Sequence, residues 1–208
     1  MMVCSSLLIS GCTQKNSSID QNNKPSTETL EQILRKAQTI ESVYYEVNVT
    51  ETVDGKLTLN TTMKIWQETP YMKENASYSY AGVTLNVSYI QRPNGTFQFE
   101  PTKNMYVLYQ EIVLPQRSTG DVAEDLLNNR SLIILGTETI DGKTTTVIQY
   151  TTNQSENSTT MKMWIWNDKG VPLKLLETRI REDMTFTWDY SYHDYLFEDI
   201  PDNTFDIS

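Results

Sequence analysis

Apolar and polar residues alternate over most of this chain beyond residue 42, and this period of two restricts its fold more than any other feature. The first run, residues 42–49, places its most apolar residues at odd positions, and residues 57–65 do the same after the dipeptide Asp54-Gly55. Side chains of a β-strand point alternately to the two faces, and Asp-Gly is a typical two-residue hairpin turn. The pattern predicts two antiparallel strands joined by a hairpin.

Shorter runs of the same kind follow, separated by turn residues such as Ala81-Gly82, Asp141-Gly142 and Asp168-Lys169-Gly170. They are residues 72–78, 84–91, 96–99, 105–110, 132–140, 144–152, 161–167, 171–181 and 184–192. An all-antiparallel meander is the simplest way to connect them. The fold class predicted is therefore mainly β with some α (α+β), built on a curved antiparallel sheet.

Two segments have apolar residues at helical spacing instead. Residues 27–38 can be capped by Ser26 or Thr27, and residues 119–128 by Ser118 or Thr119. Each presents one apolar face. Two short helices cannot cover a sheet of this size, so the pattern predicts a concave apolar trough or a barrel lumen.

One strand face should line this trough, because its side chains are mostly valine, leucine, methionine and aromatic residues. The predicted lining residues are Val43, Tyr45, Val47, Val49, Leu57, Leu59, Met63, Ile65, Leu85, Val87, Tyr89, Phe97, Phe99, Met161, Met163, Ile165, Phe186, Trp188 and Tyr190. Apolar residues in a pocket and in a packed core look alike in a sequence, so a filled interior is the alternative.

The N-terminus carries a second informative motif. Cys12 follows the charge-free residues 1–11 and has Ile9 three places before it, then Ser10-Gly11. This resembles the lipobox of secreted lipoproteins, in which the cysteine is lipidated and becomes the mature N-terminus. The alternative is an apolar N-terminus without a special role, since the segment is far too short to span a bilayer. The domain prediction is a signal segment at 1–12, a flexible polar tether at 13–26 and a single domain at 27–208.

The acceptor pattern Asn-x-Ser/Thr recurs more often than the roughly three matches that chance would give at this Ser/Thr content. It occurs at Asn16, Asn48, Asn60, Asn75, Asn86, Asn94, Asn129, Asn153 and Asn157. Glycosylation of an exported protein is one explanation, and a polar, threonine-rich sheet surface is the other. In either case alternation places Asn48, Asn60 and Asn86 on the polar face.

Composition argues against several other functions. The net charge is -10, with 27 acidic and 17 basic residues, which does not fit nucleic-acid binding. Of the two cysteines, Cys4 lies in the predicted signal segment and Cys12 is the predicted lipid site, so neither a disulfide nor a cysteine-ligated metal is expected. His193 is the single histidine, and no Gly-x-Ser-x-Gly motif accompanies it. We expect no catalytic residues, no metal and no cofactor.

Trp164 and Trp166 alternate with the predicted trough residues of their strand and should point outward with Lys162. Tryptophan favours half-wet positions, so they could form a partner-binding patch or rest on a membrane. Packing beneath a loop or beneath the C-terminal segment is the alternative.

Several segments, in this order, resemble the LolA-like lipoprotein carriers, a family that includes the mycobacterial lipoprotein carriers of the LppX kind and the RseB-type sensor domains. They are Met63-Lys64-Ile65-Trp66 with Pro70, residues 94–101 with Asn104-Met105-Tyr106, residues 140–143 with 147–150, residues 163–166 with 170–174, and Phe197, Ile200-Pro201-Asp202 and Phe205. The resemblance covers residues 27–208. It implies a half-open barrel lidded by helices whose concave face holds acyl chains or a hydrophobic peptide.

Two functions follow from these observations. The first is a membrane-anchored surface lipoprotein that binds a lipid, a lipoprotein acyl chain or another hydrophobic ligand in the trough. The second is an envelope sensor or scaffold that binds another protein. A lipid on Cys12 would hold the protein at one membrane, unlike carriers that shuttle between two.

Overall fold

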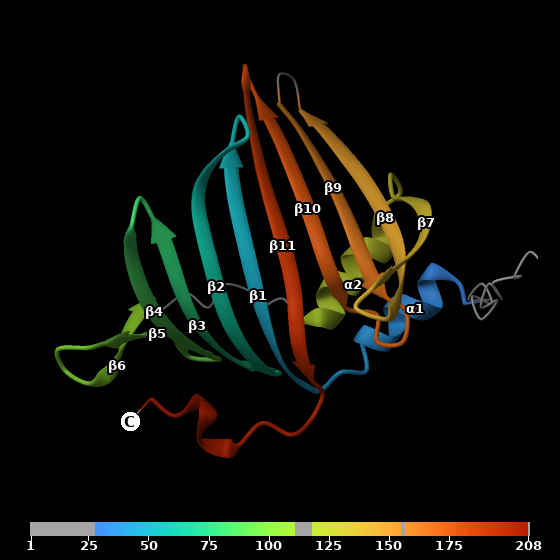
Figure 1. The fold of residues 1–208 in the computed structure, drawn as a ribbon. Coiled ribbons are helices and arrows are strands. Elements are labelled where there is room, and N and C mark those ends of the chain that lie inside the picture. The colour runs from blue at the N-terminus through green and yellow to red at the C-terminus, as the bar shows by residue number, and fades with distance from the viewer. Residues whose placement is uncertain (1–27, 111–117, 155–156, 208) are drawn as a thin grey trace, which may run out of the picture.

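The computed structural model describes residues 28–110, 118–154 and 157–207, and their main feature is one antiparallel sheet of 11 strands that stays open (Figure 1). The mainly β fold class predicted above is confirmed. The strands are β1 (Ser42–Val53), β2 (Lys56–Glu68), β3 (Tyr71–Tyr80), β4 (Val83–Arg92), β5 (Gly95–Glu100), β6 (Met105–Gln110), β7 (Ile133–Ile140), β8 (Lys143–Gln154), β9 (Asn157–Trp166), β10 (Pro172–Arg181) and β11 (Met184–Leu196). The predicted signal segment at 1–12, with Cys12, and the tether at 13–26, with Asn16, lie outside the described residues.

The strand order differs from a single meander. It is β6-β5-β4-β3-β2-β1-β11-β10-β9-β8-β7, so the first and last strands meet at the centre of the sheet. A simple meander would have placed β7 beside β6, whereas these two strands form the opposite edges. The helix between them in the chain, α2 (Thr119–Asn128), packs on the β8–β10 half of the sheet.

Hairpin turns join the strands where the sequence predicts them. Asp54 and Gly55 have φ angles of 50° and 74°, and Asp141 and Gly142 have φ angles of 48° and 75°. Two successive residues with positive φ are the requirement of the hairpin turn whose twist matches the flanking strands. These local signals therefore pair β1 with β2 and β7 with β8.

Both predicted helices are present, and the bounds of the first differ. α1 runs over Leu30–Ala37 and is capped by Thr29, whose hydroxyl accepts from the backbone N–H of Gln32 while the Gln32 side chain accepts from the backbone N–H of Thr29. This reciprocal pair satisfies two helix-end donors and fixes the start later than Ser26 or Thr27 would. Ser118 caps α2 through an equivalent pair with Asp121.

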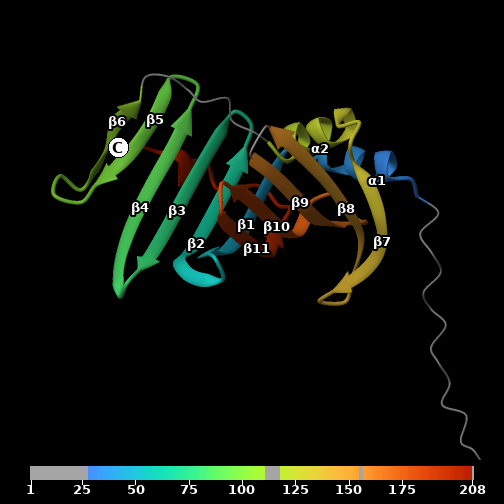
Figure 2. The same ribbon diagram turned by 90° about the horizontal axis from the view of Figure 1, so that it is seen from above.

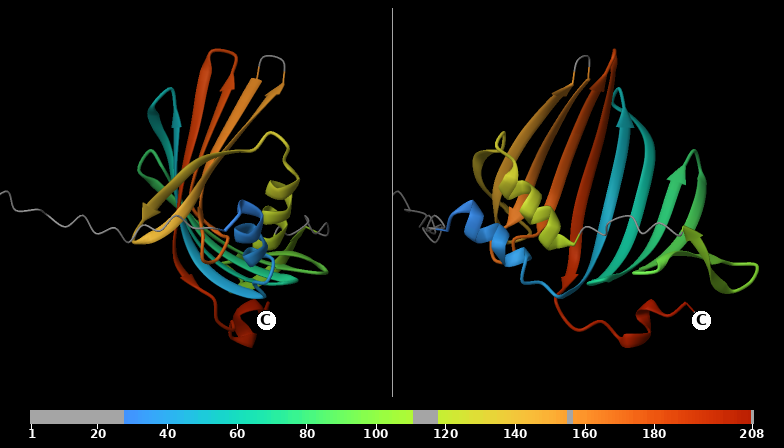
Figure 3. Two further views of the ribbon diagram at one scale, coloured as in Figure 1. Left: turned by 90° about the vertical axis from the view of Figure 1, so that its right-hand side faces the viewer. Right: turned by 180° about the vertical axis from the view of Figure 1, so that it is seen from behind.

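The helices lie together inside the curve of the sheet (Figure 3). The largest core cluster joins Ile33 and Leu34 of α1 and Leu126 of α2 to Ile148 and Ile165 of the sheet. We call the sheet face that contacts α1 and α2 the inner face, and the opposite one the outer face. Seen from above, both helices lie beside β7–β10, and β4–β6 form the other end of the sheet (Figure 2).

The C-terminal segment packs on the outer face. Ile200 and Phe205, the latter in the short 3-10 helix η1 (Asp202–Phe205), form a cluster with Ile90 of β4. The Arg92 guanidinium donates two hydrogen bonds to the Phe205 carbonyl, at 3.0 and 2.7 Å. Within the described part of the chain, neither helix has the length and apolar character needed to cross a bilayer.

Candidate ligand-binding cavity

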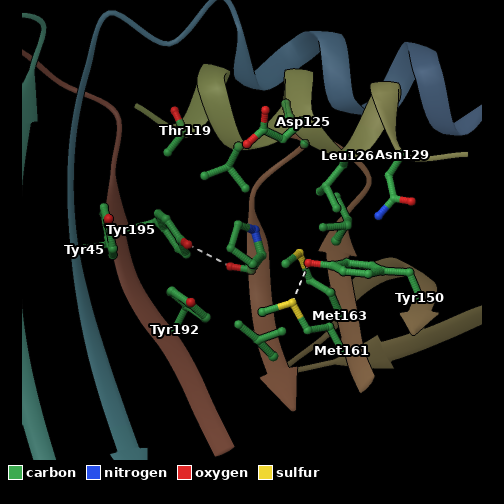
Figure 4. A pocket seen from close by; sticks show the side chains of 16 residues that line it. Tyr45, Thr119, Asp125, Leu126, Asn129, Tyr150, Met161, Met163, Tyr192 and Tyr195 are labelled. Atoms are coloured by element: carbon green, nitrogen blue, oxygen red, sulfur yellow. Dashed lines mark hydrogen bonds between the residues drawn. The ribbon is translucent and has the colours of Figure 1, made fainter. Parts of the chain in front are cut away.

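A cavity of about 360 Å³ lies between α2 and the inner face of β8–β11 (Figure 4). This volume lies within the range of small-molecule sites, which begins at roughly 300 Å³. Its lining residues are Tyr45, Thr119, Val122, Ala123, Asp125, Leu126, Asn129, Tyr150, Met161, Met163, Ile165, Gly170, Pro172, Leu175, Tyr192 and Tyr195. Side chains therefore fill the space between α2 and the sheet only in part.

Alternation along β9 directs Met161, Met163 and Ile165 into the cavity. Across the strand pairs, Met163 faces Leu175 on β10 and Ile148 on β8. Directly opposed residues of an antiparallel pair share a face, so the apolar floor extends over three strands. Unbranched methionine adapts to ligands of irregular shape, which suits a floor of this kind.

Three tyrosines from β1 and β11 form the wall opposite α2. The rings of Tyr45 and Tyr195 stack with centroids 5.3 Å apart, and the Tyr195 hydroxyl donates to the Pro172 carbonyl at 2.7 Å. Burial raises the pKa of Tyr45 to about 12, with a smaller contribution from the negative charge of Glu74, and burial also raises the pKa values of Tyr192 and Tyr195. These phenols stay protonated at neutral pH and can bind polar ligand groups.

A smaller hollow of about 190 Å³ continues along the inner face towards the tips of β1, β2 and β11. It is lined by Val49, Glu51, Leu59, Thr61, Met63, Tyr78, Trp188 and Tyr190. Glu51 accepts a hydrogen bond from the Trp188 indole N–H at 2.8 Å, which satisfies both groups at the half-buried wall.

The predicted trough residues divide between these places. Tyr45, Met161, Met163 and Ile165 line the cavity, and Val49, Leu59, Met63, Trp188 and Tyr190 line the hollow. Val43 and Val47 lie on the same face but are core residues. Strand pairing also places Leu85, Val87, Tyr89 and Phe186 on the inner face, where Leu85 is 61% exposed.

The structure places three predicted trough residues elsewhere. Phe97 lies directly opposite Ile90, so Phe97 and Phe99 belong to the outer face. The two-residue turn between Arg92 and Gly95 sets this register, and hairpin register decides which face a side chain takes.

Leu57 is the third correction. A β-bulge between Glu51 and Thr52 pairs Leu57 with Thr52, and Leu57 is 59% exposed. The extra residue of a bulge interrupts the alternation on which the prediction relied.

Trp164 and Trp166 of β9 point away from the cavity, as predicted, but Trp164 is not exposed enough to form a binding patch. It is 7% exposed, lies beneath Lys162 at 4.5 Å from the ring centroid, and donates to Glu138 at 2.7 Å. Trp166 packs against Phe197 with centroids 6.1 Å apart. Trp166 therefore fits the alternative prediction, packing against the C-terminal segment.

His193 lies on the outer face in a polar network with Glu46 and Asp194. The three residues bring one possible metal-binding atom each within 4.8 Å of one another. Their side chains already bond to protein groups: His193 contacts Asn48 and Asp194 at 2.8 Å each, and Glu46 accepts from Tyr44 and Lys64. The hydrogen bond from Tyr44 is the main cause of a lowered Glu46 pKa. The arrangement needs no ion to account for it.

Of the possible glycosylation sites within the described residues, Asn129 lines the cavity and the other seven lie away from it. Register places Asn48, Asn60, Asn75 and Asn86 on the outer face of four neighbouring strands. Asn94, Asn153 and Asn157 lie in turns or near strand ends, and Asn129 is the C-cap residue of α2. Among these eight residues only Asn75 and Asn129 are half-buried.

Sequence reasoning missed several cavity residues. Tyr192 ends the predicted strand 184–192 and continues the alternation of Trp188 and Tyr190, so the same parity would have identified it as a lining residue. Tyr195 lies beyond Asp194, whose φ of 53° coincides with a break in the register between β1 and β11. No residue pattern near Asp194 predicts this break. The α2 residues were predicted as an apolar helix face without an assigned position over the sheet.

The fold and the site together define a helix-lidded, half-open antiparallel barrel with an apolar internal cavity. No family model and no curated protein matches the sequence. The chain is similar to the solved structure of LprF from Mycobacterium bovis, with 13% identity, 80% of this chain and 92% of that chain covered, and a TM-score of 0.46.

Two further solved structures are similar to this chain. MucB, solved in complex with MucA(peri), has 15% identity, with 83% of this chain and 56% of MucB covered and a TM-score of 0.45. The LolA superfamily protein NE2245 from Nitrosomonas europaea has 14% identity, with 86% and 98% covered and a TM-score of 0.38. The likeness is one of fold, and the argument below depends on the residues of this chain.

Proposed function

We propose that this protein is an exported lipoprotein that binds the acyl chain of a lipid or lipoprotein, or another hydrophobic ligand, in the cavity beneath α2. The observation that supports this most is the cavity itself, which has an apolar floor of Met161, Met163 and Leu175 and a few polar groups in its walls. Binding sites for apolar ligands are typically concave, mostly apolar and supplied with a few polar groups.

Blocking the cavity tests this proposal. Val122 is half-buried on the α2 side of the cavity, so Val122→Phe adds a ring to the space that a ligand would occupy. Glu124→Phe adds the same ring to the exposed surface of α2 and serves as the matched control. We expect lipid to copurify with wild type and Glu124→Phe, detected by native mass spectrometry and extraction, and to be depleted in Val122→Phe. Wild-type protein that is consistently free of ligand would contradict the proposal.

The proposed anchor is a lipid on Cys12, with residues 1–12 as signal segment, 13–26 as tether and 27–208 as the binding domain. Support for it comes from the lipobox-like residues 9–12. Expression of Cys12→Ser in a host that lipidates proteins should move the protein from the membrane fraction to the aqueous fraction. Mass spectrometry of the N-terminal peptide would show directly whether Cys12 carries a lipid.

Glycans on the outer face are part of the same proposal. Four acceptor asparagines, one on each of β1 to β4, share the face opposite the cavity. Sugars there would leave ligand entry free. Peptide mapping of the protein from its native source, before and after enzymatic deglycosylation, would identify modified sites.

A second candidate function is binding of another protein, and the surface that favours it is not the predicted tryptophan pair. Ile133, Ile134 and Leu135 are exposed on β7, an edge strand of the sheet. Exposed edges can pair with a strand of a partner. Crosslinking in membranes would detect a partner, and Ile134→Lys should abolish the crosslink while Trp164→Ala should not act specifically on it.

A further inference from the structure

An unpaired carboxylate lies among the tyrosines of the inner face. Glu74 of β3 is directly opposite Ile65 of β2 and Tyr89 of β4, and Ile65 is in turn opposite Tyr45 of β1. These residues form one row across four strands, and neighbouring strands are about 4.8 Å apart. Glu74 therefore starts roughly 10 Å from the backbone of Tyr45, a cavity-lining residue.

Among the residues that the structure describes, Glu74 differs from the other carboxylates of the inner face because it has no hydrogen-bond or ion-pair partner. Glu51 accepts from Trp188 and Thr58, and Glu177 accepts from Arg179. Within the described residues, Glu74 takes part in neither a hydrogen bond nor an ion pair, although it is half-buried. Burying a charge without a partner is costly, so a cation that binds next to Glu74 would remove this cost.

The surroundings of Glu74 are aromatic. Its negative charge helps to raise the pKa values of Tyr45, Tyr78 and Tyr89, for which burial is the main cause. The three side chains thus lie within electrostatic reach of the carboxylate. Tyr109 extends the group, since its ring centroid is 5.8 Å from that of Tyr89. Aromatic faces next to a negative charge are the usual surroundings of a bound ammonium group.

We propose that Glu74, together with Tyr45, Tyr78 and Tyr89, binds the ammonium group of an amphiphilic lipid whose alkyl chain occupies the neighbouring cavity. This inference rests on the proposed function and adds the charge of the ligand's polar end. Charge complementarity selects the ligand class: a carboxylate attracts a cation and disfavours a phosphate or carboxylate head. Tyr45 borders both places and connects the chain-binding region to the ammonium-binding region.

Three probes with equal alkyl chains separate charge from apolar binding: decyltrimethylammonium, 1-decanol and decanoate, each used below its aggregation concentration in calorimetric titrations. For wild type we expect the cation to bind about tenfold more tightly than the alcohol, and decanoate to bind most weakly. Glu74→Gln keeps the shape of the side chain and removes its charge. It should abolish the preference for the cation and leave the affinity for decanol within about twofold.

Glu124→Gln is the matched control, because it changes the net charge equally at an exposed position of α2. It should keep the preference for the cation. Tyr89→Leu, which retains apolar surface, should weaken the cation several-fold without affecting decanol.

Two outcomes would overturn the inference in distinguishable ways. Equal affinity of wild type for the cation and the alcohol, or an unchanged preference in Glu74→Gln, rejects the ammonium site and leaves the binding of apolar chains intact. If wild type binds none of the three probes, the ammonium site and the proposed function fail together.

Discussion

Gly170 allows α1 to lie directly on the turn between β9 and β10, and Gly170→Ala tests how much this close approach contributes to stability. A Cβ atom at residue 170 would lie 2.3 Å from the Ile33 carbonyl oxygen and 2.9 Å from the Ala37 backbone nitrogen. An ordinary contact begins at about 3.4 Å, so α1 must move by roughly 1 Å. Both contact atoms belong to the backbone, and no side-chain rotation can relieve the overlap.

Gly142 provides a matched control. Its φ of 75° equals that of Gly170, and a Cβ atom at residue 142 would meet nothing within 4 Å. Gly142→Ala therefore measures the cost of a left-handed backbone alone, about 1–2 kcal/mol. Gly170→Ala adds the cost of displacing α1, for which overpacked sites suggest about 1–3 kcal/mol more.

Urea unfolding followed by circular dichroism gives both free energies, and thermal scans should separate the two variants by about 2–4 °C for each kcal/mol of difference. Gly170 also lines the cavity, so Gly170→Ala should weaken decanol binding while Gly142→Ala should not. Equal stability losses in the two variants would refute the reasoning, because the helix contact would then contribute nothing.

Three further predictions concern polar groups of the inner face. Arg179→Ala leaves Glu177, which is 5% exposed, without its cation and should lower the free energy of unfolding in urea by about 1–3 kcal/mol. The double variant Arg179→Met with Glu177→Leu should recover most of this loss. If Arg179→Ala alone leaves the stability unchanged, the ion pair does not contribute to it. Tyr195→Phe removes the hydroxyl that donates to the Pro172 carbonyl and should lower the free energy of unfolding by about 1 kcal/mol. Tyr80→Phe, at an exposed site, should leave the stability unchanged, and equal losses in the two variants would contradict the prediction. Burial raises the pKa of Glu74 above its ordinary 4.5, so in the absence of ligand the protonated form favours folding and this contribution is lost as the pH rises through the folded-state pKa. Glu74→Gln should therefore stabilise the protein at pH 7 but not at about pH 4, and a variant no more stable than wild type at pH 7 would argue against a strained carboxylate.

Local features of the fold were predictable from the sequence because they depend on neighbouring residues. Alternation identified the strands, and Asp54-Gly55 and Asp141-Gly142 identified two hairpins. The meeting of β1 with β11 was not predictable in this way, since residues 42–53 and 184–196 are far apart in the chain. Such a pairing depends on the total arrangement of apolar surfaces, for which short-range patterns carry no signal.

The residues that were misplaced share a physical cause. Leu57 follows a bulge, and Phe97 lies beyond a turn whose length sets the register. A shift of one residue moves a side chain to the opposite face, so a single irregularity cancels an otherwise sound parity argument. Trp164 was placed on the correct face, but burial there depends on Lys162, Lys174 and Glu138 from three strands.

The open trough follows from the dimensions of the elements. A sheet of 11 strands is roughly 48 Å wide at a spacing of about 4.8 Å, whereas α1 and α2, with 8 and 10 residues, are about 12 and 15 Å long. The helices can shelter only part of the inner face, and in the part that neither helix reaches, Tyr80, Val83 and Leu85 are 63%, 71% and 61% exposed.

A hydrophobic ligand would cover apolar surface of the inner face that α1 and α2 do not cover, so ligand binding should increase the stability of the protein. A ligand at a hundred times its dissociation constant adds about 2.7 kcal/mol to the free energy of unfolding. A stabilisation of this size by decyltrimethylammonium, reduced in Glu74→Gln but not in Glu124→Gln, would connect the apolar trough to the carboxylate of Glu74.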